Sequence, residues 1–243
     1  MKKLFPLIIL IFIISSCTVM TMEPYRTADT LGAPLRFRVG LDVQSGQLIP
    51  EQTNPDTLND IGVGIPAGKL YAGIGIWNNI DAYASASYGF PFSIDYGGGI
   101  KYQYINKLGF KAAVVPHIKY AEAEDMIVAS GINSKDTLNY KLIGGELPFA
   151  FTYSIINIIM ISGGVHAGYY QLDYIDQSGA VDKYDFMSYG AYIMPEVKLG
   201  VIRVSLGVDY RRYYSPKMPI EYSDTYSPLR RNFHPFLSLS LQF

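Results

Sequence analysis

The chain has 243 residues, and its 20 basic and 21 acidic side chains leave a formal net charge of −1. This balance gives no electrostatic support for binding a phosphate backbone, so we expect no nucleic-acid partner. Hydrophobic residues make up 49% of the chain and aromatic residues 14%, including 21 tyrosines. Beyond the N-terminal segment no apolar run has the length of a membrane-spanning helix.

Residues 1–16 have the pattern of a cleaved signal peptide. Two lysines precede an apolar stretch over residues 4–14, which is too short to cross a bilayer. Small residues then lead into Cys17, and this arrangement resembles a lipobox, in which the cysteine is acylated and becomes the new N-terminus. Because Cys17 is the only cysteine, a disulfide framework within the chain and a cysteine-based metal cluster are excluded. We predict lipidation at Cys17, and an ordinary signal peptide is the alternative.

Residues 17–34 are polar and mixed, and we predict a lipid-anchored periplasmic tether. Thr18 stands where lipoproteins of the enterobacterial type carry Asp when they stay in the inner membrane, which agrees with export to the outer membrane. Residues 27–32 read TADTLG. They resemble the TARTL-G segment before the first strand of some uncharacterised outer-membrane barrel proteins, with Asp29 in place of Arg. The resemblance implies a barrel and names no activity.

From residue 35 the polarity alternates in segments separated by turns, which is typical of strands. We predict ten of them: Leu35–Gln44, Gly68–Ile76, Ile80–Tyr88, Tyr96–Ile105, Phe110–Tyr120, Leu138–Tyr153, Ile156–Leu172, Tyr184–Leu199, Val201–Tyr213 and Arg231–Phe243. Short connections alternate with longer polar ones, which are expected at 45–67, 89–95, 121–137, 173–183 and 214–230. Short turns at one end and long loops at the other are typical of outer-membrane barrels. An even strand count places both termini on the short-turn, periplasmic side.

The last strand, FHPFLSLSLQF, has an apolar face that ends on Phe243. It resembles the closing strand of a bacterial outer-membrane β-barrel. The predicted fold over residues 35–243 is therefore an all-β, antiparallel transmembrane β-barrel of about ten strands. Four prolines fall inside predicted strands, where each removes a ladder donor, and we expect bulges or strand ends at Pro116, Pro148, Pro195 and Pro235.

The polar face of these strands decides which side points inward. Its charged residues alternate with glycines, which weaken an exposed sheet but make room for long side chains inside a narrow barrel. We therefore place the polar face in the lumen and the apolar face against lipid. The predicted lumen-lining residues are Arg36, Arg38, Asp42, Lys101, Lys111, His117, Glu146, His166, Glu196, Arg203, Asp209 and Arg211. The main structural alternative is a soluble, lipocalin-like lipoprotein, whose apolar face would point inward.

A barrel of about ten strands is nearly filled by its own side chains. Opposite charges in it are expected to pair, because an unpaired buried charge is costly. We predict a structural or surface-interaction role without catalysis, and no cofactor or metal. A narrow, porin-like channel for small solutes is the alternative.

A second alternative is an outer-membrane barrel hydrolase. Its residues would be a rim histidine, His234, with Asp209 and Glu146 as carboxylate partners, as in omptin-type sites. The expected partners are outer-membrane lipid, the outer-membrane assembly machinery and surface glycolipid. For the glycolipid, Arg211-Arg212 and Arg230-Arg231 would clamp phosphate groups.

Overall fold

The computed structural model describes residues 26–45, 66–89, 93–130, 134–175, 181–214 and 233–243. Within these ranges no helix is long and apolar enough to cross a membrane. The elements are strands: β1 (Phe37–Ser45), β2 (Pro66–Trp77), β3 (Ile80–Gly89), β4 (Ser93–Lys107), β5 (Phe110–Val114), β6 (His117–Ser130), β7 (Ser134–Ile156), β8 (Ile159–Ile175), β9 (Val181–Leu199), β10 (Ile202–Tyr214) and β11 (Phe233–Gln242).

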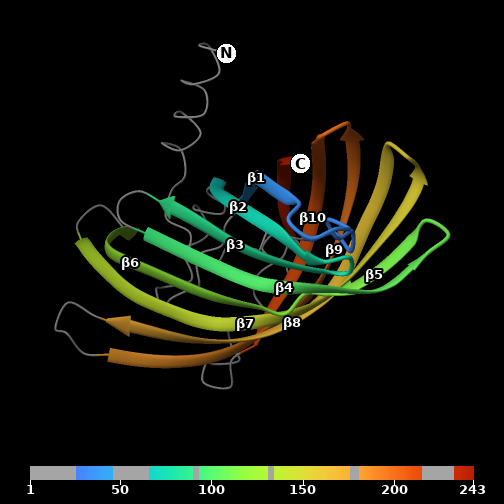
Figure 1. Cartoon of the computed structure of the whole chain (residues 1–243). Coiled ribbons are helices and arrows are strands. Elements are labelled where there is room, and N and C mark those ends of the chain that lie inside the picture. Colours follow the sequence, from blue (N-terminus) through green and yellow to red (C-terminus); the bar gives the residue numbers. More distant parts are fainter. Residues whose placement is uncertain (1–25, 46–65, 90–92, 131–133, 176–180, 215–232) are drawn as a thin grey trace, which may run out of the picture.

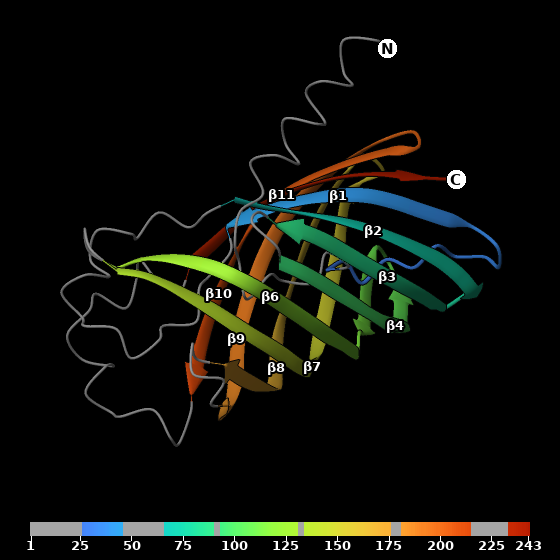
Figure 2. The ribbon, with the colours of Figure 1, turned by 90° about the vertical axis from the view of Figure 1, so that its left-hand side faces the viewer.

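The strands form one closed antiparallel barrel (Figure 1). Closure is made by β11, which pairs with β10 on one side and with β1 on the other, so that Leu239 lies opposite both Val204 and Leu41. Figure 2 shows β1 and β11 side by side. Because β5 and β6 share one place between β4 and β7, the barrel has ten strand positions. The prediction of an all-β, antiparallel barrel of about ten strands is confirmed.

Two prolines explain why β5 and β6 are separate elements. The backbone N–H of Val115 donates to Pro148 O at 2.9 Å, and that of Ile100 donates to Pro116 O at 3.1 Å. Neither proline has an N–H to complete the pair. The strand end predicted at Pro116 is confirmed. The prediction of a bulge or strand end is wrong for Pro148 and Pro195, because their pairing with β8 continues without a register shift.

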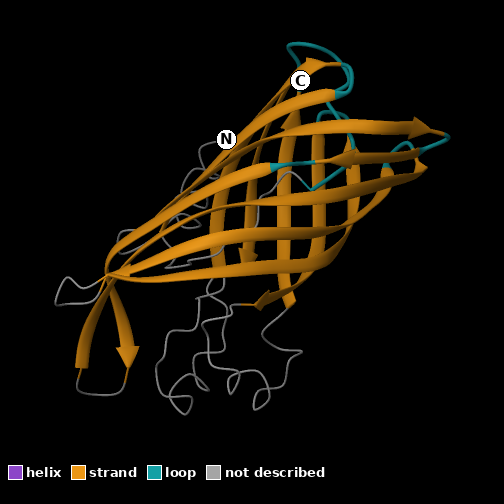
Figure 3. Ribbon diagram, turned by 90° about the horizontal axis from the view of Figure 1, so that it is seen from below, coloured by secondary structure: helices purple, strands orange, loops and turns teal. Residues whose placement is uncertain are grey.

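The short turns gather at one end of the barrel, together with the C-terminus (Figure 3). Toward the other end the strands run further than the sequence pattern indicates. The long loop predicted over residues 121–137 is wrong, because β6 and β7 remain paired up to Ser130 and Ser134. Glu122, which belongs to the predicted loop, lies 3.0 Å from Lys141 through its Oε1 and the lysine Nζ, so it forms an ion pair across two strands.

The burial of side chains alternates as predicted, with the polar face inside. In β11, residues His234, Phe236, Ser238 and Ser240 are buried, whereas Leu237 and Leu239 are about half exposed. Throughout the described strands the fully buried side chains include lysines and aspartates, and the exposed ones are mostly aliphatic and aromatic. A lipocalin-like barrel would have these two faces reversed.

Glycines on the inner face make room for large neighbours, as predicted. A Cβ at Gly144 would lie 2.3 Å from Cδ1 of Tyr170 on β8, and a Cβ at Gly207 would lie 2.3 Å from Cζ of Phe236 on β11. Both distances are far inside van der Waals contact. The two aromatic rings therefore occupy the space that a side chain would take at each glycine.

Candidate functional site

The lumen contains a segment of chain that precedes the first strand. We call residues 26–34 the inserted segment. Residues 26–31 are all at most 8% exposed. Gly32 and Leu35 have φ of +76° and +60°, and the Leu35 N–H donates to Gly75 O at 3.0 Å. At this turn the chain leaves the lumen and enters the barrel wall as β1. This differs from the periplasmic tether predicted for residues 17–34, because the described part of it finds its polar partners inside the barrel.

Backbone groups of the inserted segment bind side chains of the wall. The N–H of Leu31 donates to both carboxylate oxygens of Asp81, at 3.2 and 3.0 Å. The N–H of Ala28 donates to Thr152 Oγ1 at 2.9 Å. Irregular backbone leaves its donors unpaired, and buried donors need partners. The wall provides these partners at positions that the strands fix.

Asp29 is the most strongly bound side chain of the inserted segment. Arg203 Nη2 lies 2.6 Å from its Oδ2, and Lys111 binds its other carboxylate oxygen. Arg203 also reaches Glu196, with Nη1 2.9 Å from Oε1. Lys101 donates to the backbone oxygen of Asp29 at 3.2 Å. One aspartate thus holds three basic side chains from two sides of the lumen.

Arg26 binds the wall deeper in the barrel. Its guanidinium pairs with both carboxylate oxygens of Asp42, at 3.2 and 3.1 Å, and lies 3.9 Å above the ring of Phe236. The hydroxyl of Tyr192 donates to the Arg26 backbone oxygen at 2.7 Å. The Arg26 side chain is therefore desolvated, ion-paired and stacked on an aromatic face at once.

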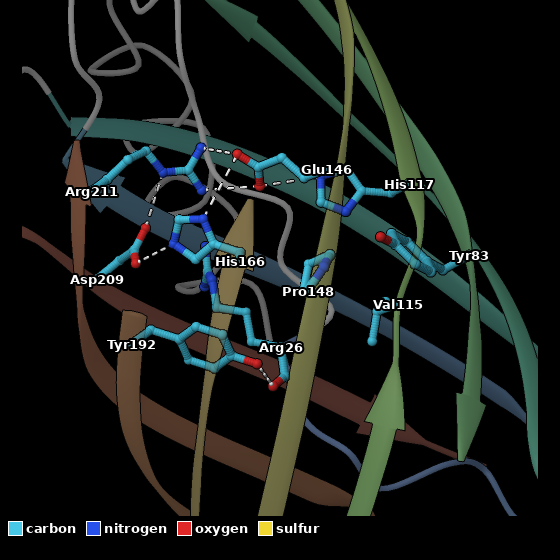
Figure 4. A pocket seen from close by; sticks show the side chains of 10 residues that line it. All are labelled: Arg26, Tyr83, Val115, His117, Glu146, Pro148, His166, Tyr192, Asp209 and Arg211. Carbon is cyan, nitrogen blue, oxygen red and sulfur yellow. Dashed lines mark hydrogen bonds and ion pairs between the residues drawn. The ribbon is translucent and has the colours of Figure 1, made fainter. Parts of the chain in front are cut away.

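A second group of charges lies beyond Arg26. We define the upper cluster as His117, Glu146, His166, Asp209 and Arg211, which line a small cavity together with Arg26 and Tyr192 (Figure 4). His166 Nε2 lies 2.9 Å from Asp209 Oδ1, and Arg211 Nε lies 3.3 Å from Asp209 Oδ2. Arg211 also donates twice to Glu146.

Glu146 has further partners around the cavity. The hydroxyl of Ser188 donates to its Oε1 at 2.9 Å, and His117 Nε2 lies 3.5 Å from its Oε2. All five members of the upper cluster are at most 6% exposed. The cluster could in principle move a proton between histidine and carboxylate, but each carboxylate is occupied by an arginine and another donor.

The predicted catalytic residues are only partly brought together. Asp209 lies opposite His234 in the pairing of β10 with β11, yet its carboxylate binds His166 and Arg211 instead. Glu146 joins Asp209 through Arg211. Among the described residues no group of three histidine, cysteine or acidic side chains could hold a metal.

Most of the predicted lumen-lining residues are buried inside the barrel, and two lie at its end. Arg36 is exposed and Lys111 is half-buried, both close to the short turns. The prediction that Arg36 lines the lumen is therefore wrong. The remaining ten are buried: Arg38, Asp42, Lys101, His117, Glu146, His166, Glu196, Arg203, Asp209 and Arg211.

Lys69, Asp81 and Asp95 are lumen residues that were not predicted from the sequence. Lys69 and Lys119 each lie 3.0 Å from a different carboxylate oxygen of Asp95, and Asp81 binds the inserted segment. Their alternation with apolar neighbours in β2, β3 and β4 was a signal that could have identified them.

Arg211 and Arg212, the described half of the expected basic clamp, point to opposite faces of the wall. Arg211 points into the lumen, whereas Arg212 is exposed beside Tyr210, with its guanidinium carbon 5.6 Å from the ring centre. The reason is the strand period, which sends adjacent side chains to opposite faces. Arg230 and Arg231 lie outside the described residues, as does Cys17.

No family model matches this chain. No curated protein matches it either. Among solved structures it is similar to the attachment invasion locus protein Ail of Yersinia pestis, with a TM-score of 0.37, 8% identity, and coverage of 87% of this chain and 99% of that one.

The outer membrane protease OmpT of Escherichia coli gives a TM-score of 0.44 at 9% identity, covering 89% of this chain and 100% of that one. The translocator domain of autotransporter NalP from Neisseria meningitidis gives 0.36 at 9% identity, covering 87% and 89%. At these scores the likeness assigns no activity to this chain.

Proposed function

We propose that this protein is a lipid-anchored outer-membrane β-barrel with a closed lumen and a structural or surface-interaction role. The observation that carries the proposal is the inserted segment, whose residues 26–31 are buried among ion-paired side chains of the wall. Charges that bind one another and a segment of the same chain serve to fill the barrel. Within the described ranges these charges leave no wide path for a solute, and the histidine–carboxylate pairs of the lumen are buried.

The outer surface supports a membrane location. Aliphatic side chains such as Ile161, Val165 and Leu206 are between 41% and 61% exposed. On β8, Ile161 lies opposite the exposed Tyr153, and the exposed Tyr169 follows eight residues later. At about 3.3 Å per residue these levels are about 26 Å apart along the strand, or about 20 Å in height for a strand tilted by about 40°. The spacing fits an apolar band between two aromatic girdles.

The C-terminal strand fits the same proposal. Leu237, Leu239 and Leu241 point outward, and Phe243 ends the chain at 64% exposure on the short-turn side. The outer-membrane assembly machinery would bind this exposed apolar face of the strand before the barrel closes. Outer-membrane lipid would cover the same face afterwards. We place the short turns and the C-terminus in the periplasm.

Membrane fractionation of the Cys17→Ser variant tests the proposal. A membrane barrel stays in the outer-membrane fraction without its lipid and keeps a heat-modifiable migration on gels. Recovery of the variant as a soluble protein would overturn the proposal in favour of a lipid-anchored soluble barrel.

Planar-bilayer recording tests the closed lumen. The intact protein is expected to give no discrete conductance steps. A variant that lacks residues 18–31 is expected to give them, because the remaining wall charges become hydrated. Discrete steps from the intact protein would favour the narrow channel instead.

A further inference from the structure

We infer that the chain enters the lumen from the long-loop end, so that the mature N-terminus and the C-terminus lie on opposite sides of the barrel. The inserted segment is then one additional crossing, through the lumen rather than in the wall. The inference rests on the proposed function in one respect only, namely that the long-loop end faces the cell exterior.

The direction of the inserted segment follows from the depth of its contacts. Leu31 binds Asp81, the second residue of β3 from the short-turn end. Ala28 binds Thr152, four residues before the end of β7 at that same side. Arg26 binds Asp42, five residues after the start of β1, at a depth of about 17 Å along the strand. Read toward the N-terminus, the chain moves steadily away from the short turns.

The lumen below Arg26 leaves little room for the chain to turn back. Lys101, Asp81 and Thr152 have no exposed surface at this level, and neither does Ala28 of the inserted segment. A second pass of backbone would have to displace these contacts and leave its own polar groups without partners. The path back to the short-turn end is therefore costly.

Open space lies on the side of Arg26 that faces the long-loop end. The small cavity lined by Arg26, Tyr192 and the upper cluster begins at Arg26, the first residue of the inserted segment. Figure 4 shows Arg26 on one side of this cavity and Arg211 with Glu146 on the other. Glu146 lies ten residues before the end of β7, twice as far from the short turns as Arg26's partner Asp42 lies along β1. The cavity thus continues the route toward the long loops.

The chain length from Arg26 to Cys17 is sufficient for this route. The nine residues from 17 to 25 span up to about 30 Å when extended. Arg26 lies at a depth of about 17 Å, and the band between the aromatic levels on β8 is about 26 Å along the strand. An acylated Cys17 can therefore reach the membrane surface at the long-loop end. The lipid anchor would sit in the outer leaflet, not in the periplasmic leaflet expected from the strand count.

Cysteine labelling on intact cells tests the side of the membrane. The reporter is Thr21→Cys, with Ser227→Cys in the connection between β10 and β11 and Asn157→Cys in the exposed turn between β7 and β8 as controls. A membrane-impermeant maleimide is expected to label positions 21 and 227 on intact cells, and position 157 only after the outer membrane is permeabilised. Labelling of position 21 together with position 157 would overturn the inference. The parent protein gives the background from Cys17, and heat-modifiable migration verifies that each variant is folded.

Energy transfer in the refolded, detergent-solubilised protein tests the geometry without reference to the cell. In a Cys17→Ser background, dyes at positions 21 and 227 are expected to transfer energy more efficiently than dyes at positions 21 and 157. The reverse order would overturn the inference. If the two labelling controls behave alike on cells while the energy transfer keeps the expected order, the proposed membrane function fails and the threaded lumen stands.

Discussion

Arg203 on β10 and Asp29 in the inserted segment form a buried ion pair, with 2.6 Å between Nη2 and Oδ2, although they are 174 residues apart in the sequence. The same arginine binds Glu196 on the neighbouring strand, and the same aspartate binds Lys111 on β5. The pair therefore connects the inserted segment to two separate parts of the wall. It makes the segment part of the folded barrel.

Replacing Asp29 by Asn is expected to destabilise the barrel. Arg203 and Lys111 would lose a shared carboxylate, and removing one partner of a buried ion pair costs about 3–5 kcal/mol. Urea unfolding in lipid vesicles, followed by heat-modifiable migration, measures the change. The matched control is Asp173→Asn, whose partner Lys183 lies 3.6 Å away with a side chain that is 61% exposed. That control is expected to change stability by less than about 1 kcal/mol, and equal effects would contradict the buried position of Asp29.

A double-mutant cycle on Glu146 and Arg211 tests the upper cluster. We expect Glu146→Gln and Arg211→Gln together to cost less than the sum of the single changes, with a coupling of about 0.5–3 kcal/mol. The cycle on Glu122 and Lys141, whose lysine side chain is 52% exposed, serves as the comparison and should give about 0.2–1 kcal/mol. Additive effects at Glu146 and Arg211 would show that the pair does not hold the lumen together.

The glycines of the inner face give a test of lumen packing. Ala at Gly144 would place its Cβ 2.3 Å from Tyr170 and 2.4 Å from the Tyr169 backbone oxygen, so Gly144→Ala is expected to cost about 1–3 kcal/mol or to prevent folding. Gly68→Ala is the control, because its Cβ would meet nothing nearer than Leu41 at 4.0 Å. Refolding yield and urea midpoints distinguish the two variants, and equal behaviour of both would contradict the tight contact between Gly144 and Tyr170.

The outer face can be tested with a single charge. Leu239 is 48% exposed in the middle of β11, and Leu239→Arg is expected to cost about 2–4 kcal/mol if this position faces the hydrocarbon core. Leu108 is 100% exposed in a short turn, and Leu108→Arg is expected to have little effect. Stability in vesicles measures both. Little effect at Leu239 would indicate that this face meets water.

Much of the barrel could be predicted because the alternation of polar and apolar residues along a strand shows which side chains point inward. Alternation placed Asp42, Glu146, Asp209 and most of the other lumen residues correctly, and turn residues placed the short connections. The long loop predicted over residues 121–137 failed for a physical reason. Charged residues such as Glu122 are typical of loops, but when they pair across strands with a residue such as Lys141 they also stabilise a longer sheet.

The candidate site was harder to predict, because it depends on which side chains meet across the lumen. Asp209 has His234 directly opposite in register, but its carboxylate reaches His166, two strands away on β8. Neither spacing nor alternation carries that information.

By itself the sequence determined the all-β class, about ten strand positions and the face that most side chains take, because these depend on periods of two residues and on local turns. Only the tertiary structure decided that residues 26–31 lie inside the barrel. A short polar segment without periodicity has no local signal for burial. Its partners Asp42, Asp81 and Arg203 come together only when β11 closes against β1.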